Sequence, residues 1–198
     1  MIIVGPPSAP VTPAIVLASD SFNRADTAAN TIGPLDYAQG GIVTGLTWLV
    51  SAQMQIISNQ VGGTVSTARF ASVDTLVTDG YAEVEVVAVD GGVCGRFTDV
   101  NNCYVFRYIS TTNNVFLDKR IGGVSTNLWA SATGVFTPGA GQKLGLLCEG
   151  STISGYINGI LVTTVTDTSI TTGTRWGMRS GSASTAFRLD NWIMKNTA

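Results

Sequence analysis

The stretch ISGYINGILVTTVTD, residues 153–167, alternates apolar and polar residues on both sides of an Asn158-Gly159 pair. Both residues of the pair accept positive φ, which suits a type I′ turn whose twist matches the two strands that it joins. The stretch therefore predicts a β-hairpin. Turn residues at 90–93 and at 99–102 predict two further hairpins in the middle of the chain.

The rest of the chain has the same character. Short β-prone runs alternate with turn residues, and no stretch keeps a helical period over three turns. We expect strands near 14–19, 42–50, 53–58, 64–70, 81–89, 93–98, 103–109, 114–120, 143–149, 152–158, 160–166, 174–179 and 186–194. About a dozen strands are too many for one twisted open sheet. The sequence therefore predicts an all-β fold, a two-sheet antiparallel β-sandwich of the jelly-roll type.

The first residues differ in composition from the remainder. Residues 5–13, GPPSAPVTP, hold four of the six prolines and cannot pair as a central strand. We therefore assign residues 1–17 to an extended, proline-rich N-terminal arm and residues 18–198 to one domain. A chain of 198 residues can bury a core without disulfide bonds.

Charge and hydropathy exclude several classes of partner. Charged residues make up 12% of the chain and the net charge is −2, so no basic stripe is available for nucleic acid. Apolar runs such as 14–18 are far shorter than the roughly 18 to 20 residues that cross a bilayer, which predicts a soluble protein without membrane insertion. The start, MIIVGPPSAP, has no basic segment, so we expect no secretory signal peptide and a cytoplasmic site of synthesis.

The cysteine and histidine contents exclude much chemistry. The three cysteines, Cys94, Cys103 and Cys148, are an odd number without CxxC spacing, which predicts buried free thiols. The chain has no histidine, which removes Ser-His-Asp triads, Cys-His dyads and every His-ligated metal site. No phosphate-binding glycine pattern or nucleophile-elbow pattern is found.

Four segments carry a family resemblance: DSFNRAD (20–26), CGRFTDVNNCYVFR (94–107), the hairpin at 153–167 and FRLDNW (187–192). Their order and spacing resemble those of the concanavalin A-like lectin/glucanase jelly rolls. Within that group the chain looks most similar to laminin-G-like modules of bacteria and phage virion proteins. The resemblance covers roughly residues 18–195. It implies two curved sheets packed face to face, with the concave sheet and its rim loops binding sugars, proteins or no known ligand, and it specifies no single activity.

The resemblance allows a test for catalysis. Glucanases of this superfamily carry Glu-x-Asp-x-x-Glu, or a form one residue shorter, as nucleophile, helper acid and general acid/base. The segment YAEVEVVAVD (81–90) offers Glu83 and Glu85 for the first two positions, but Val87 or Ala88 stands at the third. Loss of the general acid lowers a rate by roughly 10² to 10⁴. We therefore predict no catalytic residues, with a glucanase as the less favoured alternative.

The two glutamates have other uses. If residues 91 and 92 form a two-residue turn, Glu83 and Glu85 share a sheet face with Arg96 and Arg107. Cross-strand acid–base pairs would then contribute about 0.2 to 1 kcal/mol each. The same four side chains could instead line a glycan-binding groove, and both interpretations stay open here.

The tryptophans also have two interpretations. Trp48 and Trp192 lie in apolar runs and are expected in the core. Trp129 and Trp176 lie near loops, where they either pack in the core or stack on a sugar ring.

Metal binding is a further candidate, because the resemblance implies a structural Ca²⁺ in many related jelly rolls. Oxygen ligands are available in Asp20 near the first strand and in Asp190 with Asn191 near the last. These strands are neighbours in the family. Asp99 and Asn101 form a second oxygen-rich cluster. The alternative is that these side chains bond the backbone of their own turns.

The composition also suggests a setting. Low charge and a mean hydropathy of +0.28 suit a domain that buries part of its surface against copies of itself or a scaffold. With the resemblance, we expect a non-enzymatic phage virion surface protein, either a capsid decoration (head fibre) or a short tail module. Its N-terminal arm would contact capsid or tail proteins, and it would form homo-oligomers and contact host-surface glycan as a secondary function. The alternative is a stand-alone carbohydrate-binding lectin.

Overall fold

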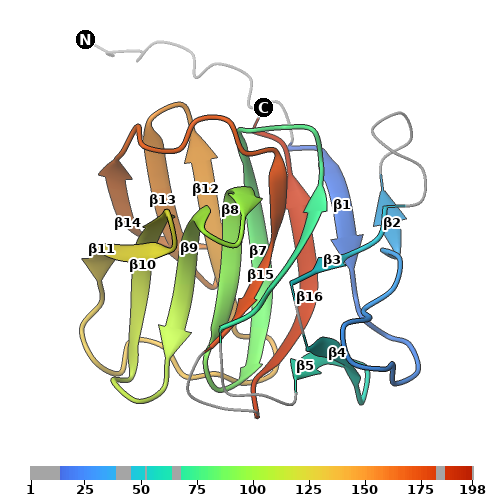
Figure 1. The fold of residues 1–198 in the computed structure, drawn as a ribbon. Helices are drawn as coiled ribbons and strands as arrows, with labels where there is room; N and C mark the ends of the chain where they lie inside the picture. Colours follow the sequence, from blue (N-terminus) through green and yellow to red (C-terminus); the bar gives the residue numbers. More distant parts are fainter. Residues whose placement is uncertain (1–13, 39–45, 52, 64–67, 182–185, 198) are drawn as a thin grey trace, which may run out of the picture.

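The computed structural model describes residues 14–38, 46–51, 53–63, 68–181 and 186–197. These residues form sixteen strands and no helix, and the strands make two antiparallel sheets packed face to face (Figure 1). The predicted jelly-roll sandwich is thus confirmed. None of the described residues belongs to a helix with the length and apolar character needed to cross a lipid bilayer.

The first sheet has nine strands, in the order β14-β13-β12-β7-β16-β1-β2, with the β4–β5 hairpin joined to β16. Its strands are β1 (Val16–Asp20), β2 (Tyr37–Ala38), β4 (Met54–Ile57), β5 (Gln60–Gly63), β7 (Gly80–Ala88), β12 (Lys143–Glu149), β13 (Thr152–Ile157), β14 (Ile160–Thr166) and β16 (Arg188–Lys195). Pairing of β1 with β16 confirms that the first and last long strands are neighbours.

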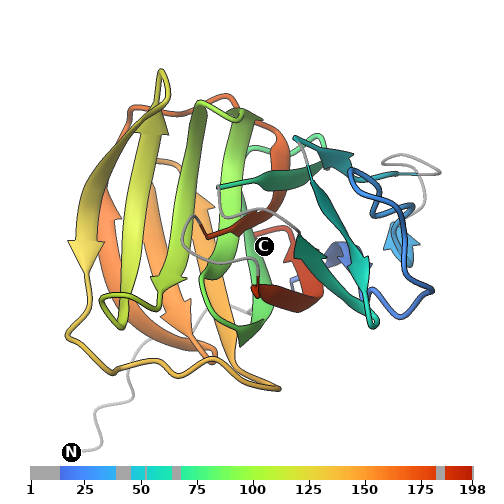
Figure 2. The same ribbon diagram turned by 60° about the horizontal axis from the view of Figure 1, so that its bottom comes forward.

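The second sheet has seven strands, in the order β11-β10-β9-β8-β15-β6-β3. Its strands are β3 (Leu49–Val50), β6 (Phe70–Asp74), β8 (Gly91–Asp99), β9 (Asn102–Ile109), β10 (Asn114–Ile121), β11 (Val124–Ala130) and β15 (Arg175–Ser180). Figure 2 shows the run from β8 to β11 lying over the run from β12 to β14.

Two of the three predicted hairpins are confirmed. Asn158 and Gly159 have φ values of 52° and 78° and join β13 to β14, as a type I′ turn requires. The turn at 99–102 joins β8 to β9. The third prediction was wrong, because residues 90–93 pass from β7 in one sheet to β8 in the other. Strand β7 already has β12 and β16 on its two edges, so β8 finds no free edge there.

One core fills the space between the sheets. It is built from inward-facing residues such as Val84 and Leu144 of the nine-stranded sheet and Phe106 of the seven-stranded sheet. Trp48 and Trp192 belong to it as expected, with ring centroids 4.9 Å apart. Close packing of this kind fixes the distance and register of the two sheets.

The three cysteines are buried free thiols, as predicted. Burial raises the pKa of Cys103 and of Cys148 to about 12, and that of Cys94 well above its usual value. All three are therefore protonated and unreactive at neutral pH.

The ends of the predicted elements differ in places from the structure. Val16 and Leu17, which the domain boundary placed in the arm but which fall in the strand expected near 14–19, belong to β1. Residues 1–13 lie outside the described residues. The parts of two predicted strands at 42–45 and 64–67 also lie outside them. Strand β11 was missed because it is an exposed edge strand whose first four residues are all solvent-facing, which leaves no apolar alternation to detect.

Candidate functional site

A pocket of about 310 Å³ opens on the outer face of the nine-stranded sheet. We call it the acidic pocket because four of its lining residues are acids, Asp20, Asp36, Glu83 and Glu85. Its lining consists of Ser19, Asp20, Ser21, Asp36, Glu83, Glu85, Lys143, Asn191, Trp192 and Ile193. These residues come from β1, β7, β12, β16 and the segment before β2, so only the folded sheet assembles them.

The period of strand β7 places both glutamates in this pocket. Ala82, Val84 and Val86 are fully buried in the core, and the residues between them point to the opposite face. Glu83 and Glu85 therefore emerge side by side on the outer face. Glu85 is only 7% exposed, so its carboxylate depends on protein partners.

Each carboxylate is held by separate donors. Glu83 accepts a hydrogen bond of 2.8 Å from the Tyr81 hydroxyl and lies 3.3 Å from the Lys143 ammonium. Glu85 accepts from the Gly141 backbone N–H at 2.7 Å and from the Asn191 side-chain amide at 3.0 Å. The two acids are thereby fixed in orientation while the pocket stays open.

Two tyrosines lie beside Glu83, outside the residues that line the pocket: Tyr81 contacts Glu83, and Tyr156 contacts Tyr81. The rings of Tyr81 and Tyr156 meet edge to face, with centroids 5.4 Å apart. Gly145 of β12 makes room for them, since a Cβ there would lie 2.3 Å from the Tyr81 hydroxyl oxygen. Burial and the bond to Glu83 raise the pKa of Tyr81, which keeps its hydroxyl a donor.

Sequence reasoning named Glu83 and Glu85, and named Asn191 only as a calcium ligand, but missed Tyr81, Lys143 and Gly141 as partners that orient the glutamates. Lys143 stands in register with Glu85, and Gly145 with Glu83. The alternation of β12 and β13 could have placed Lys143 and Tyr156 on an outer face. No local signal shows that β12 is the neighbour of β7, because 54 residues separate the two strands along the chain.

The predicted pairing of the glutamates with Arg96 was wrong. Arg96 is 1% exposed and lies in the interior. Its guanidinium donates to the carbonyls of Thr78, Ile170 and Gly150 and to the Asp79 carboxylate, the last two at 2.6 Å. The cause is a bulge in β8 at this point, where Arg96 has a φ of 44°, together with the change of sheet after β7.

Arg107 does not join the glutamates either. It lies in β9 of the other sheet, where its Nε is 2.6 Å from the Asp118 carboxylate of β10. Asn127 of β11 donates to the same carboxylate at 3.2 Å. The ion pairs expected between β7 and the strands that follow it are therefore not formed. Glu83 pairs with Lys143 on one sheet, and Arg107 pairs with Asp118 on the other.

The two tryptophans near loops have different environments. Trp176 is fully buried, and its indole N–H donates to the Val77 carbonyl at 3.0 Å. It faces the core, so it is not a platform for a sugar. Trp129 is half-buried, packs 6.3 Å from Phe106 between ring centroids, and lines a separate apolar hollow of about 230 Å³ with Ile160.

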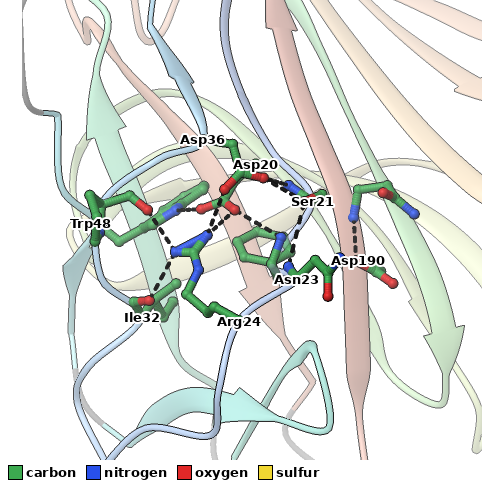
Figure 3. Close-up of polar contacts among 11 residues, drawn as sticks. Asp20, Ser21, Asn23, Arg24, Ile32, Asp36, Trp48 and Asp190 are labelled. Atoms are coloured by element: carbon green, nitrogen blue, oxygen red, sulfur yellow. Dashed lines mark hydrogen bonds and ion pairs between the residues drawn. The ribbon is translucent and has the colours of Figure 1, made fainter.

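Asp20 is the centre of a buried polar cluster shown in Figure 3. Its carboxylate accepts from the Phe22 N–H at 2.8 Å, from the Trp48 indole at 2.7 Å and from Arg24. Arg24 also donates to the carbonyls of Ile32 and Pro34. The segment DSFNRAD thus connects β1 to the following loop through hydrogen bonds. The guanidinium of Arg24 is the positive charge that pairs with Asp20.

The oxygen-rich clusters proposed for calcium are engaged in local bonds. The Asp190 carboxylate accepts from the Asn191 N–H, and that of Asp99 accepts from the N–H of Asn101. Burial raises the pKa of Asp190 and that of Asp20. Within the described residues no three Cys, Asp or Glu side chains gather as a metal site requires. These local bonds are those of the Asx alternative, and the calcium site stays a prediction of the sequence.

Comparison with known proteins gives relatives in structure alone. No protein-family model matches the chain, and no curated protein sequence matches it. Among solved structures, carbohydrate binding module CBM66 from Bacillus subtilis has a TM-score of 0.57 at 15% identity, covering 75% of this chain and 92% of that one. Domain 4 of the arabinanase AbnA from Geobacillus stearothermophilus, in complex with arabinotriose, has 0.52 at 14%, covering 93% and 94%. The endo-β-1,3-glucanase from Pyrococcus furiosus has 0.55 at 8%, covering 93% and 95%.

The chain has the two-sheet jelly-roll fold of these proteins. Because the identities are so low, the likeness establishes the fold and leaves the activity to be argued from the site.

Proposed function

We propose that the protein is a non-catalytic, lectin-like carbohydrate-binding module whose acidic pocket holds a neutral sugar. The observation that carries the proposal is the pair of separately oriented carboxylates, Glu83 and Glu85, in an open pocket beside two tyrosine rings. Sugar hydroxyls donate to carboxylates, and the Lys143 ammonium and Asn191 amide supply the complementary donors. The Tyr81 and Tyr156 rings offer apolar area for a face of the sugar ring.

The same pocket supports binding in preference to hydrolysis. Retaining glycosidases need a carboxylic acid that protonates the leaving oxygen and a second carboxylate about 5 to 5.5 Å from it. The positions where the third acid of the glucanase pattern would stand are Val87 and Ala88, which have no proton to give. Tyr81 and Lys143 instead hold Glu83 in place, through the hydrogen bond from the Tyr81 hydroxyl and the ion pair with Lys143.

The structural neighbours favour this class of function. One is named as a carbohydrate binding module and another as a domain in complex with arabinotriose. Placement on a phage virion, contacts with capsid or tail proteins, homo-oligomer formation and the cellular location stay predictions of the sequence.

The test is a screen of the full chain against neutral oligosaccharides, followed by calorimetry on the best ligand. Glu83→Gln and Tyr156→Ala are each expected to weaken binding at least tenfold, because one removes a charged acceptor and the other half of the aromatic pair. The matched control is Glu149→Gln, an exposed acid at the far end of β12, which should bind as the parent does. Equal binding by Glu83→Gln and the parent would overturn the assignment of the pocket, and measurable turnover of a β-glucan would revive the glucanase alternative.

A further inference from the structure

A groove runs over the outer face of the seven-stranded sheet, on the opposite side of the sandwich from the acidic pocket. It consists of two hollows of about 240 and 250 Å³ that share Ser51, Phe70 and Val100 in their linings. One end is apolar and includes Phe97, and the other end is lined by Arg69 and Arg120. We call this surface the arginine groove.

The guanidinium groups of this groove lack acidic partners. Within the described parts of the chain, neither Arg69 nor Arg120 forms an ion pair. Arg120 donates from Nε to the Val100 carbonyl at 2.7 Å, and Arg69 donates from Nη1 to the Ala68 carbonyl. The one carboxylate in the lining, Asp99, is engaged by the turn that follows it.

A third arginine adds to the excess of positive charge beside this groove. Arg179 of β15 is 9% exposed, and its guanidinium carbon lies 5.9 Å from the centre of the Phe70 ring. Its Nη1 and the Nε of Arg69 are buried without a hydrogen-bond partner among the described residues. Burial, and the nearby charge of Arg107, lower the pKa of Arg179 to about 10, so it remains charged at neutral pH. Buried donors without acceptors cost free energy that a ligand could recover.

The chemistry of the groove defines the ligand that it fits. Guanidinium groups recognise carboxylate, sulfate and phosphate through paired hydrogen bonds. The Phe70 and Phe97 rings, with centroids 5.5 Å apart, offer apolar area for a ring beside those donors. We propose that the arginine groove is a second binding site, for an anionic saccharide whose sugar ring lies on the phenylalanines and whose acidic group meets Arg69 and Arg120. The proposal is independent of the acidic pocket, which lies on the other sheet.

The experiment measures binding of glucose 6-sulfate, glucose 6-phosphate, glucuronic acid, glucose and inorganic sulfate to the full chain by calorimetry or NMR titration. At least one anionic sugar is expected to bind ten times more tightly than glucose and than inorganic sulfate, with an affinity that falls as salt is added. Arg69→Gln and Arg120→Gln should each weaken that binding at least fivefold while the melting temperature is retained. The matched control, Arg188→Gln in the nine-stranded sheet, should leave it unchanged.

Three results would overturn the proposal. Equal binding of glucose and all three anionic sugars would remove the role of the arginines. Binding of inorganic sulfate as tight as that of the best anionic sugar would leave an oxyanion site without sugar recognition. Unchanged affinity in both glutamine variants would place the ligand elsewhere. Glu83→Gln should retain anionic-sugar binding, so failure of the acidic-pocket proposal and failure of this one give different patterns.

Discussion

The outer faces of the two sheets differ in how far the protein itself supplies hydrogen-bond partners for their charged side chains. In the acidic pocket Glu83 and Glu85 each have two donors from the protein itself. At the arginine groove the Nε of Arg69, and beside it the Nη1 of Arg179, are buried without a hydrogen-bond partner among the described residues. Charges that the chain satisfies internally are fixed in place, whereas unsatisfied charges keep their capacity to bind a ligand. This difference is why we propose neutral hydroxyls as the ligand of the acidic pocket and an acidic group as the ligand of the arginine groove.

The largest expected effect tests what a fully partnered buried arginine contributes. Arg96→Met should lower the free energy of unfolding by about 3 kcal/mol, because it leaves the buried Ile170 carbonyl without its donor and removes the bonds to Gly150 and Asp79. Urea unfolding followed by tryptophan fluorescence measures this. A loss below about 1 kcal/mol would contradict the prediction. It would show that water can replace the guanidinium and that the hydrogen bonds of Arg96 contribute little to stability.

The next effect concerns the ion pair that links the two sheets at one edge. Lys119 of β10 lies 2.6 Å from the carboxylate of Asp167, which follows β14 and also accepts from the Tyr104 hydroxyl. Burial would raise the pKa of Asp167, but the bonds from Lys119, Tyr104 and Ser169 outweigh it and hold the pKa below its usual range.

A depressed pKa in the folded state means that the ionised Asp167 stabilises the protein above the unfolded pKa of about 3.9. That contribution is lost as the pH falls through the lower folded value. Asp167→Asn should therefore cost about 2 kcal/mol at pH 7, and the difference from the parent should shrink below about pH 4. Denaturant midpoints at pH 7, 4 and 2.5 measure it. A difference that does not vary with pH would assign the cost to the loss of geometry and not of charge.

A smaller effect is expected at Arg179, whose Nη1 is buried without a hydrogen-bond partner among the described residues. Arg179→Met should change the free energy of unfolding by less than about 1 kcal/mol, since a buried charge that forms no ion pair within the described residues is replaced by an apolar side chain of similar length. The measurement is the same urea titration, with Arg96→Met as the contrasting variant. A loss as large as that of Arg96→Met would show that the unpartnered Nη1 of Arg179 does not make this arginine easier to replace than Arg96.

The smallest effect is expected on removal of metal. Arg24 already supplies the positive charge beside Asp20, so EDTA should leave the melting temperature unchanged. A drop in EDTA that added Ca²⁺ reverses would restore the calcium prediction for Asp20 and Asp190. Such a result would also show that the stability of the fold near the acidic pocket depends on a bound cation.

Local patterns carried a large part of the fold. The Asn158-Gly159 turn, the alternation of β13 and β14 and the burial of the three cysteines could all be predicted from neighbouring residues. Glu83 and Glu85 were placed on one face by the period of a single strand. These features depend on backbone conformation and on the contrast between apolar and polar side chains, both of which are written locally.

The partners of the charged residues could not be predicted in this way. The turn at 90–93 resembles a hairpin, yet β7 and β8 separate into different sheets, and this one difference moved Arg96 and Arg107 away from the glutamates. A bulge then turned Arg96 into the interior. A shift of one residue reverses the face to which a strand's side chains point, so small local irregularities decide which charges meet.

By itself, the sequence determined an all-β sandwich without histidine chemistry, its principal hairpin and the positions of its core tryptophans, because hydrophobic period and turn residues act over a few residues. Only the tertiary structure decided that Glu83 meets Lys143, that Asp20 meets Arg24 and Trp48, and that Arg69, Arg120 and Arg179 gather around one groove. The physical reason is that strand order brings together residues far apart in the chain. The free energy that selects this order comes from burying one shared core, to which these charged groups contribute little.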